Sequence, residues 1–164
     1  MIYADHAATT KISEKAKLAM LSAMEKDWYN PSSLYTPGQQ ASGTLMDARV
    51  RIAHCLGCLP KEIYFTSGGS EADNQAILSA AAIGKRQGKM HIISTAFEHH
   101  AVLHTLKKLE KEGFEITLLD VGEKGIVSLA QVEKAIRPDT ALVTVMYANN
   151  EIGTIQPIRE IGAV

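Results

Sequence analysis

The chain has 164 residues, 46% of them hydrophobic and 21% charged, and its 17 basic and 18 acidic residues give a net charge of −1. This balance is typical of a globular protein and argues against nucleic acid or an anionic membrane as a partner. No apolar run approaches the roughly 20 residues of a membrane span. The first ten residues do not form a secretion signal. We therefore expect a cytoplasmic protein.

Two helices are predicted near the N-terminus. Residues 13–26 form the first, with Ser13 as N-cap. Residues 37–56 form the second, with Thr36 as N-cap and Pro37 as the first helical residue. The apolar side chains expected to face a core are Ala16, Ala19, Met20, Ala23 and Met24 on the first helix, and Leu45, Ala48, Ile52 and Leu56 on the second.

The rest of the chain alternates between strand and helix patterns. Each strand is a continuous run of apolar or β-branched residues, as expected when helices cover both faces of a sheet. The alternation predicts an α/β fold with a mainly parallel sheet flanked by helices. Ligands of such sheets bind beyond the carboxyl ends of the strands. The expected strands are residues 62–66, 90–94, 114–119 and 140–148, and the expected helices are residues 70–85, 99–111 and 128–136, with a further one opening at Pro157.

The segment FTSGGSEADN, residues 65–74, has the pattern of an anion site. Gly68 and Gly69 lack a Cβ and allow a ligand to approach the backbone. Ser70 is expected as the N-cap of the next helix, and Glu71 lies in its first turn, where the helix dipole favours negative charge. A helix that starts this way directly after a strand favours phosphate binding. The alternative is a tight turn without a ligand.

Histidine and asparagine side chains follow two other predicted strands. In FEHHAVLHT, His99 stands at the turn from strand to helix, in position to stack on a planar ring. His100 and His104 share a helix face, which favours a solvated face over half of a metal site. In YANNEIGTIQP, Asn149 and Asn150 either form a turn or offer an amide to a ligand oxygen.

The two cysteines of the chain, Cys55 and Cys58, form a C-x-x-C pair in HCLGC. Such a pair occurs in zinc sites and redox dithiols. A structural zinc site needs four ligands, and no second pair is present. The pair also lies at the end of a predicted helix that Gly57 terminates, whereas a reactive dithiol lies at a helix start. We therefore predict that both cysteines are small buried hydrophobic residues.

Five segments in chain order resemble one known family. They are YADHAATT, NPSSLY, FTSGGSEADN, FEHHAVL and YANNEIGTIQPI, and together they cover essentially the whole chain. The chain is similar to pyridoxal 5'-phosphate (PLP) enzymes of the class V aminotransferase group, and within it to cysteine desulfurases of the NifS-like class. Two places depart from the family pattern: Tyr35 stands where His is usual, and Gly69-Ser70 where Ala-Thr is common.

The resemblance implies which residues hold the cofactor. Gly69, through its backbone, and Ser70, through its backbone and hydroxyl, would bind the PLP phosphate. His99 would stack on the pyridine ring as a cofactor-binding and catalytic residue. Asn150 would hydrogen-bond near the phenolic oxygen of the ring and the substrate. No metal is implied.

The resemblance also implies a fold and a reaction. The fold would be the N-terminal part of the large domain of the PLP-dependent transferase fold (fold type I). That domain would be incomplete over residues 1–164, with an N-terminal arm at 1–60 and an alternating cofactor-binding part at 61–164. The reaction would convert L-cysteine to alanine and an enzyme persulfide for iron–sulfur cluster or thiolation pathways. A sulfur-acceptor or scaffold protein would be the partner, and the enzyme would be a homodimer.

Three groups that this reaction needs are expected beyond Val164: the Schiff-base lysine, the aspartate on the pyridine nitrogen and the sulfur-accepting cysteine. The chain on its own is therefore expected to be inactive. The alternatives are another class V PLP enzyme, such as a selenocysteine lyase or a transaminase, and a non-catalytic interaction fragment. A nucleotide-binding domain is disfavoured, because neither G-x-G-x-x-G after the first strand nor the P-loop pattern is present.

Overall fold

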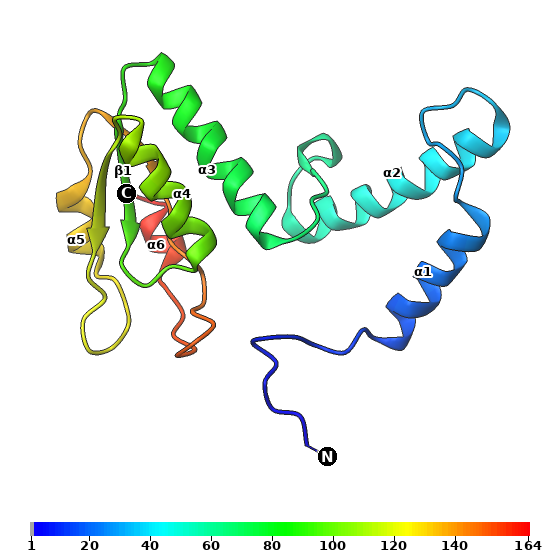
Figure 1. Ribbon diagram of the computed structural model, residues 1–164, viewed down its shortest axis with the longest axis horizontal. Helices are drawn as coiled ribbons and strands as arrows, with labels where there is room; N and C mark the ends of the chain where they lie inside the picture. Colours follow the sequence, from blue (N-terminus) through cyan, green and yellow to red (C-terminus); the bar gives the residue numbers. More distant parts are fainter. Residues whose placement is uncertain (1) are drawn as a thin grey trace. The chain divides into compact units, whose positions relative to one another are not determined.

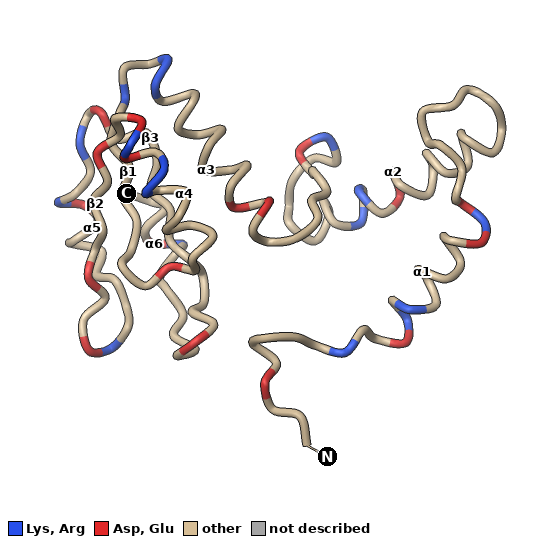
Figure 2. The backbone as a smooth tube through the Cα atoms, viewed as in Figure 1, with Lys and Arg blue, Asp and Glu red and all other residues tan. Residues whose placement is uncertain are grey.

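The computed structural model describes residues 2–164. The chain divides into two compact units, one ending at Phe65 and the other spanning Thr66–Val164. Each unit is described by itself. Acidic and basic residues are interspersed along both units (Figure 2). No helix within residues 2–164 has the length and apolar character needed to cross a membrane.

The first unit contains two helices and a 3-10 turn (Figure 1). Helix α1 spans Glu14–Lys26, α2 spans Thr36–Leu56, and a 3-10 turn spans Pro60–Glu62. Ser13 caps α1 as predicted, because its Oγ accepts a hydrogen bond from the backbone N–H of Ala16 at 3.2 Å. The N-cap predicted for α2 was wrong by one residue: Tyr35 is the N-cap and makes no side-chain capping bond.

The apolar faces predicted to be buried on these two helices are exposed. Helix α1 has no buried residue, and α2 buries only Gly38, Ala41 and Ala53. Met24 of α1 is 65% exposed and Leu56 of α2 is 70% exposed. The apolar periodicity therefore predicted the positions of the helices correctly, but it does not identify a surface that covers their apolar faces. The prediction that both cysteines are buried was wrong for Cys55, which is exposed, while Cys58 is half-buried.

The second unit is an α/β fold built on a three-stranded parallel sheet (Figure 1). The strands are β1 (His91–Thr95), β2 (Glu115–Leu119) and β3 (Thr140–Val143), in the spatial order β2-β1-β3. The central strand β1 pairs in parallel with both neighbours, and all five of its residues are buried. The helices are α3 (Gly69–Arg86), α4 (His100–Lys111), α5 (Leu129–Ala135) and α6 (Ile158–Ile161). The predicted fold class is therefore confirmed.

Helices cover both faces of this sheet and enclose two cores. Because successive side chains of a strand point to opposite faces, Ile92 and Ile93 of β1 belong to different cores, and neither is exposed. Helices α3 and α4 pack on the Ile92 side, while α5 and α6 pack on the Ile93 side. Gly84 of α3 lies so close to the Cβ of Ala141 on β3 that a side chain at this glycine would clash.

One predicted strand is absent, and another is shorter than predicted. Residues 62–66 begin at the end of the 3-10 turn and continue without strand pairing, and Tyr64 is 74% exposed. Ile63 has the φ and ψ of a strand, −92° and 123°, whereas Glu62 belongs to the 3-10 turn. A strand also needs a hydrogen-bonded neighbour, and none of the described residues supplies one. The strand predicted at 140–148 ends at Val143.

A buried histidine joins the three strands at the edge opposite to the carboxyl ends. The Nδ1 of His91 lies 2.8 Å from the Oγ1 of Thr140, and its Nε2 lies 2.9 Å from the Oγ1 of Thr117. Arg137 donates hydrogen bonds to Glu115 and Asp139 at the same edge. Burial lowers the pKa of His91, and the positive charge of Arg137 lowers it further, against the attraction of the two carboxylates.

Candidate functional site

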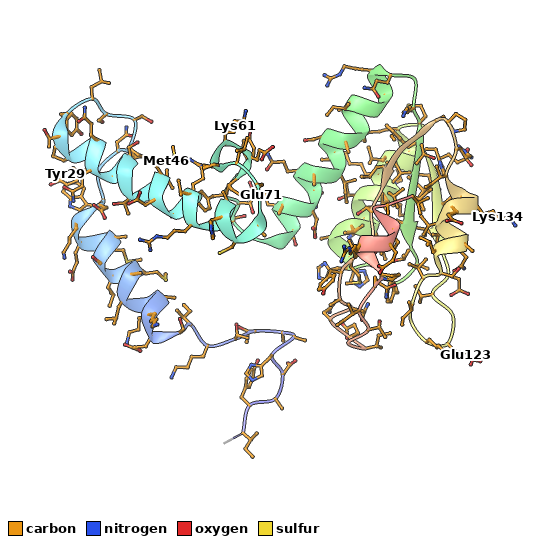
Figure 3. The ribbon with its side chains drawn as sticks, turned by 180° about the vertical axis from the view of Figure 1, so that it is seen from behind. Tyr29, Met46, Lys61, Glu71, Glu123 and Lys134 are labelled. Atoms are coloured by element: carbon orange, nitrogen blue, oxygen red, sulfur yellow. The ribbon has the colours of Figure 1, made fainter. Side chains whose placement is uncertain are left out.

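The first turn of α3 begins one residue earlier than predicted. Gly68 is the N-cap, in extended conformation, and Gly69 is the first helical residue, so Ser70 lies inside the first turn. The prediction that Ser70 caps the helix was wrong. Glu71, at the start of α3 (Figure 3), instead folds back, and its Oε2 accepts from the backbone N–H and the hydroxyl of Ser67 at 2.7 and 2.6 Å. Both hydrogen bonds lower the pKa of Glu71, and the bond from the Ser67 hydroxyl contributes the most.

The start of α3 has the donor set of an anion site. Within residues 2–164, the backbone N–H groups of Gly69, Ser70 and Glu71 have no acceptor, and neither does the Ser70 hydroxyl. A Cβ built on Gly68 or Gly69 would meet nothing within 4 Å, so the approach is open. Free N–H groups and the positive end of the helix dipole are what a phosphate group needs. The residues present therefore fit the phosphate of a cofactor.

His99 is the N-cap of α4, at the carboxyl end of β1. Its Nδ1 accepts a hydrogen bond from the backbone N–H of Ala101 at 3.1 Å. This bond fixes the tautomer, since an accepting Nδ1 carries no proton and the proton of the neutral ring is then on Nε2. His99 is exposed, which leaves its side chain accessible to a ligand.

A groove of about 410 Å³ lies between the first turns of α3 and α4. It brings the predicted residues Ser70 and His99 together, whereas Gly69 and Asn150 do not line it. His100 and His104 line it as a stacked pair, with ring centroids 5.5 Å apart. Within residues 2–164, no three His, Cys, Asp or Glu side chains are arranged so that they could hold a metal ion. The lining residues are Ser70, Asn74, His99, His100, Ala101, His104, Thr105 and Lys108.

The two asparagines of YANNEIG have different environments. Asn149 is 6% exposed, and its Oδ1 accepts from the backbone N–H groups of Glu151 and Ile152 at 2.8 and 2.9 Å. It therefore forms the turn that the sequence offered as one alternative. Asn150 is exposed, and its amide donates to the carboxylate of Glu151 at 2.8 Å. The Nδ2 of Asn149 also donates to the Phe97 carbonyl at 3.1 Å, which joins this turn to the segment preceding His99.

A buried carboxylate next to His99 was not singled out from the sequence. Glu98 is 6% exposed, and its Oε1 accepts from the hydroxyl of Thr95 at 2.7 Å and from the backbone N–H of Met146 at 2.8 Å. It thereby joins the carboxyl end of β1 to the segment after β3. Burial raises the pKa of Glu98, although these two hydrogen bonds oppose the shift. Asn74, an amide inside an otherwise Ala-rich helical pattern, was missed in the same way.

Free N–H groups at a helix start beside an imidazole, at the carboxyl edge of a parallel sheet, are typical of α/β proteins that bind phosphate-bearing ligands. The sequence matches the family Aminotransferase class-V over residues 2–164. The chain therefore belongs to this family.

Relatives and solved structures agree with this assignment. Cysteine desulfurase IscS of Methanosarcina thermophila is 48% identical over 163 residues, which are 99% of this chain and 40% of that protein. A protein of Bacillus subtilis (strain 168) is 52% identical over 98% of this chain and 42% of its own length. A solved NifS-like protein has a TM-score of 0.92 at 36% identity, covering 97% of this chain and 43% of its own.

A second solved structure is described as SspA in complex with cysteine. It has a TM-score of 0.91 at 40% identity, covering 98% of this chain and 46% of its own. The chain thus spans less than half the length of the relatives and solved structures that it matches.

Proposed function

We propose that this chain is the N-terminal segment of a PLP-dependent cysteine desulfurase. The enzyme would take the sulfur from L-cysteine with a thiol of its own, so that L-cysteine and the enzyme thiol become L-alanine and an enzyme persulfide. The observation that carries the proposal is the groove that places the open first turn of α3 and the ring of His99 side by side. The name of the Methanosarcina relative and the cysteine complex of the SspA structure support the choice of substrate.

Each residue of the proposed site has a simple task. The N–H groups of Gly69 and Ser70 and the Ser70 hydroxyl hold the cofactor phosphate. His99 stacks its ring on the pyridine ring and keeps its proton on Nε2, where the contact with Ala101 leaves it. The exposed amide of Asn150 orients the phenolic oxygen of the cofactor and the substrate. PLP, when bound, supplies the electron sink for chemistry at the substrate α-carbon.

The partners and location follow from the same proposal. A sulfur-acceptor or scaffold protein receives the persulfide sulfur for iron–sulfur cluster assembly or thiolation. The complete protein is a cytoplasmic homodimer.

The test uses the complete protein that contains this segment. The unsubstituted protein is expected to bind PLP and to release alanine from L-cysteine in the presence of a thiol reductant. His99→Ala should weaken PLP binding about fivefold and lower turnover, because a ring stack contributes about 1 kcal/mol. His104→Ala is the matched control, since His104 stacks on His100 and is not assigned to the cofactor. No alanine release, or equal losses in both variants, would refute the proposal.

A further inference from the structure

The side chain of Asn74 joins the first turns of α3 and α4. Its Nδ2 donates to the carbonyl of Ser70 at 2.8 Å and lies 3.4 Å from the carbonyl of Ala101. Its Oδ1 accepts from the hydroxyl of Thr105, which is 4% exposed. The Thr105 hydroxyl also lies 2.8 Å from the Ala101 carbonyl. One amide thus contacts a backbone group on each of the two helices that line the groove.

These contacts continue to the imidazole of His99. Ala101 is bonded on both sides of its backbone: its N–H donates to the Nδ1 of His99, and its carbonyl lies next to Asn74 and Thr105. A short path therefore runs from Ser70 through Asn74 and Ala101 to the ring of His99. A shift of the first turn of α4 along α3 would break this path and move the ring relative to Ser70.

Asparagine at position 74 lowers the helix propensity of α3, so helix formation alone does not account for this residue. Asparagine is among the weaker helix formers, because its side chain competes for backbone hydrogen bonds. Asn74 follows Ser70 by one helical turn and bonds to α4, while Ile77 and Leu78, one turn further along α3, pack in the apolar core. An apolar residue would pack there but would leave the Thr105 hydroxyl with the Ala101 carbonyl alone and remove the link to α3. The amide is the side chain that both donates to the carbonyls and accepts from the hydroxyl.

We infer that Asn74 is a positioning residue that sets the distance between the phosphate-binding first turn of α3 and the ring of His99. This inference rests on the proposed function, since it concerns the fit of one ligand that carries both a phosphate and a planar ring. A ligand with a phosphate alone binds only to the α3 turn, so its affinity does not depend on the distance between that turn and the ring of His99. A ligand with both a phosphate and a planar ring binds at both places, so its affinity depends on that distance.

The test compares these two ligands in the complete protein. Asn74→Ala should weaken PLP binding about tenfold, the factor expected for one lost hydrogen bond, and should reduce the visible circular dichroism of bound PLP. The affinity for inorganic phosphate should stay within about twofold of the unsubstituted value. Thr105→Val, which keeps the shape and removes the hydroxyl, should act in the same direction. Gln75→Ala, at the exposed neighbouring position on α3, should change neither affinity.

A ligand-free measurement separates this inference from the proposed function. The ¹⁵N chemical shift of the His99 Nδ1 reports the bond from the Ala101 N–H, and it should change in Asn74→Ala and Thr105→Val but not in Gln75→Ala. Equal loss of phosphate and PLP affinity in the two variants, or an unchanged His99 shift, would overturn the inference. Absence of PLP binding in the unsubstituted protein would overturn the proposed function alone, and the His99 shift would still decide the role of Asn74.

Discussion

Gln156 connects the turn that carries Asn150 to the turn before α5, and its removal should loosen both. The residue is 2% exposed, and its Oε1 accepts from the backbone N–H of Val127 at 2.9 Å. Its Nε2 donates to the carbonyl of Gly125 at 2.7 Å. Gln156→Leu would leave these two buried backbone groups without partners. An unpaired buried group costs about 1–3 kcal/mol, so two together should cost about 2–6 kcal/mol of local stability.

Hydrogen–deuterium exchange measures this cost at the affected amide. Because about 1.4 kcal/mol corresponds to tenfold, the protection of the Val127 amide should fall about 30- to 20,000-fold in Gln156→Leu. Gln75→Leu is the matched control, since Gln75 is exposed and makes no side-chain hydrogen bond among the described residues. If the protection of the Val127 amide stays within about threefold of that in the unsubstituted protein, the predicted cost of the two unpaired groups is refuted.

Gln156→Glu separates the donor from the acceptor. The carboxylate can still accept from Val127, but it faces the Gly125 carbonyl without a proton to donate. Burial and this carbonyl should raise the pKa of the introduced carboxyl above its unfolded value of about 4.3. The variant should therefore match the unsubstituted protein below about pH 4, where the protonated carboxyl donates to Gly125, and should lose protection as pH rises through the folded-state pKa. A loss of protection that is the same at every pH would contradict the assignment.

Two further predictions concern stability and pH in the complete protein. Because burial and Arg137 lower the pKa of His91, the unfolded state binds the proton more tightly. The stabilisation from neutral His91 should therefore be complete above about pH 6.5 and decrease as pH falls below it. Urea midpoints should show this slope, and His91→Gln should reduce it; an equal slope in the variant would contradict the assignment. Because burial raises the pKa of Glu98, Glu98→Gln, which keeps an acceptor for Thr95 and Met146, should raise the thermal midpoint at pH 7 and lose this advantage below about pH 4.5. Glu98→Ala should lower the midpoint at both pH values, and a rise would argue against the two hydrogen bonds.

The elements whose cause is local could be predicted from the sequence. The helices of the second unit, the parallel sheet and the place of His99 at the start of α4 follow from apolar runs and turn residues. The predictions failed where the conformation depends on residues that are distant in the sequence. Residues 62–66 have the composition of a strand, but pairing depends on a neighbouring strand. The apolar periodicity of α2 predicts that Leu56 packs against another apolar surface, but it does not identify that surface.

The candidate site was predictable as a set of loops but not as a hydrogen-bond network. The N-cap of α3 was misplaced because Ser70 is the better capping residue by propensity, whereas the helix begins one residue earlier, after Gly68, and has no side-chain cap. Asn74 and Glu98 bond to groups that are 27 and 48 residues away in the chain. Such bonds depend on which backbone groups the fold brings near, so residue type and spacing give only a weak signal for them.

The groups that hold the groove together are mostly ones that do not titrate near neutral pH. Asn74 and Thr105 set α3 against α4, and Asn149 holds the turn after β3 to the segment before His99. Glu98 is the ionisable exception, and it is buried against hydrogen-bond donors. Geometry set by amides and hydroxyls does not change with pH. A change in ligand affinity with pH would therefore report on the ligand, on the side chains that face it and on Glu98, whose pKa is raised by burial.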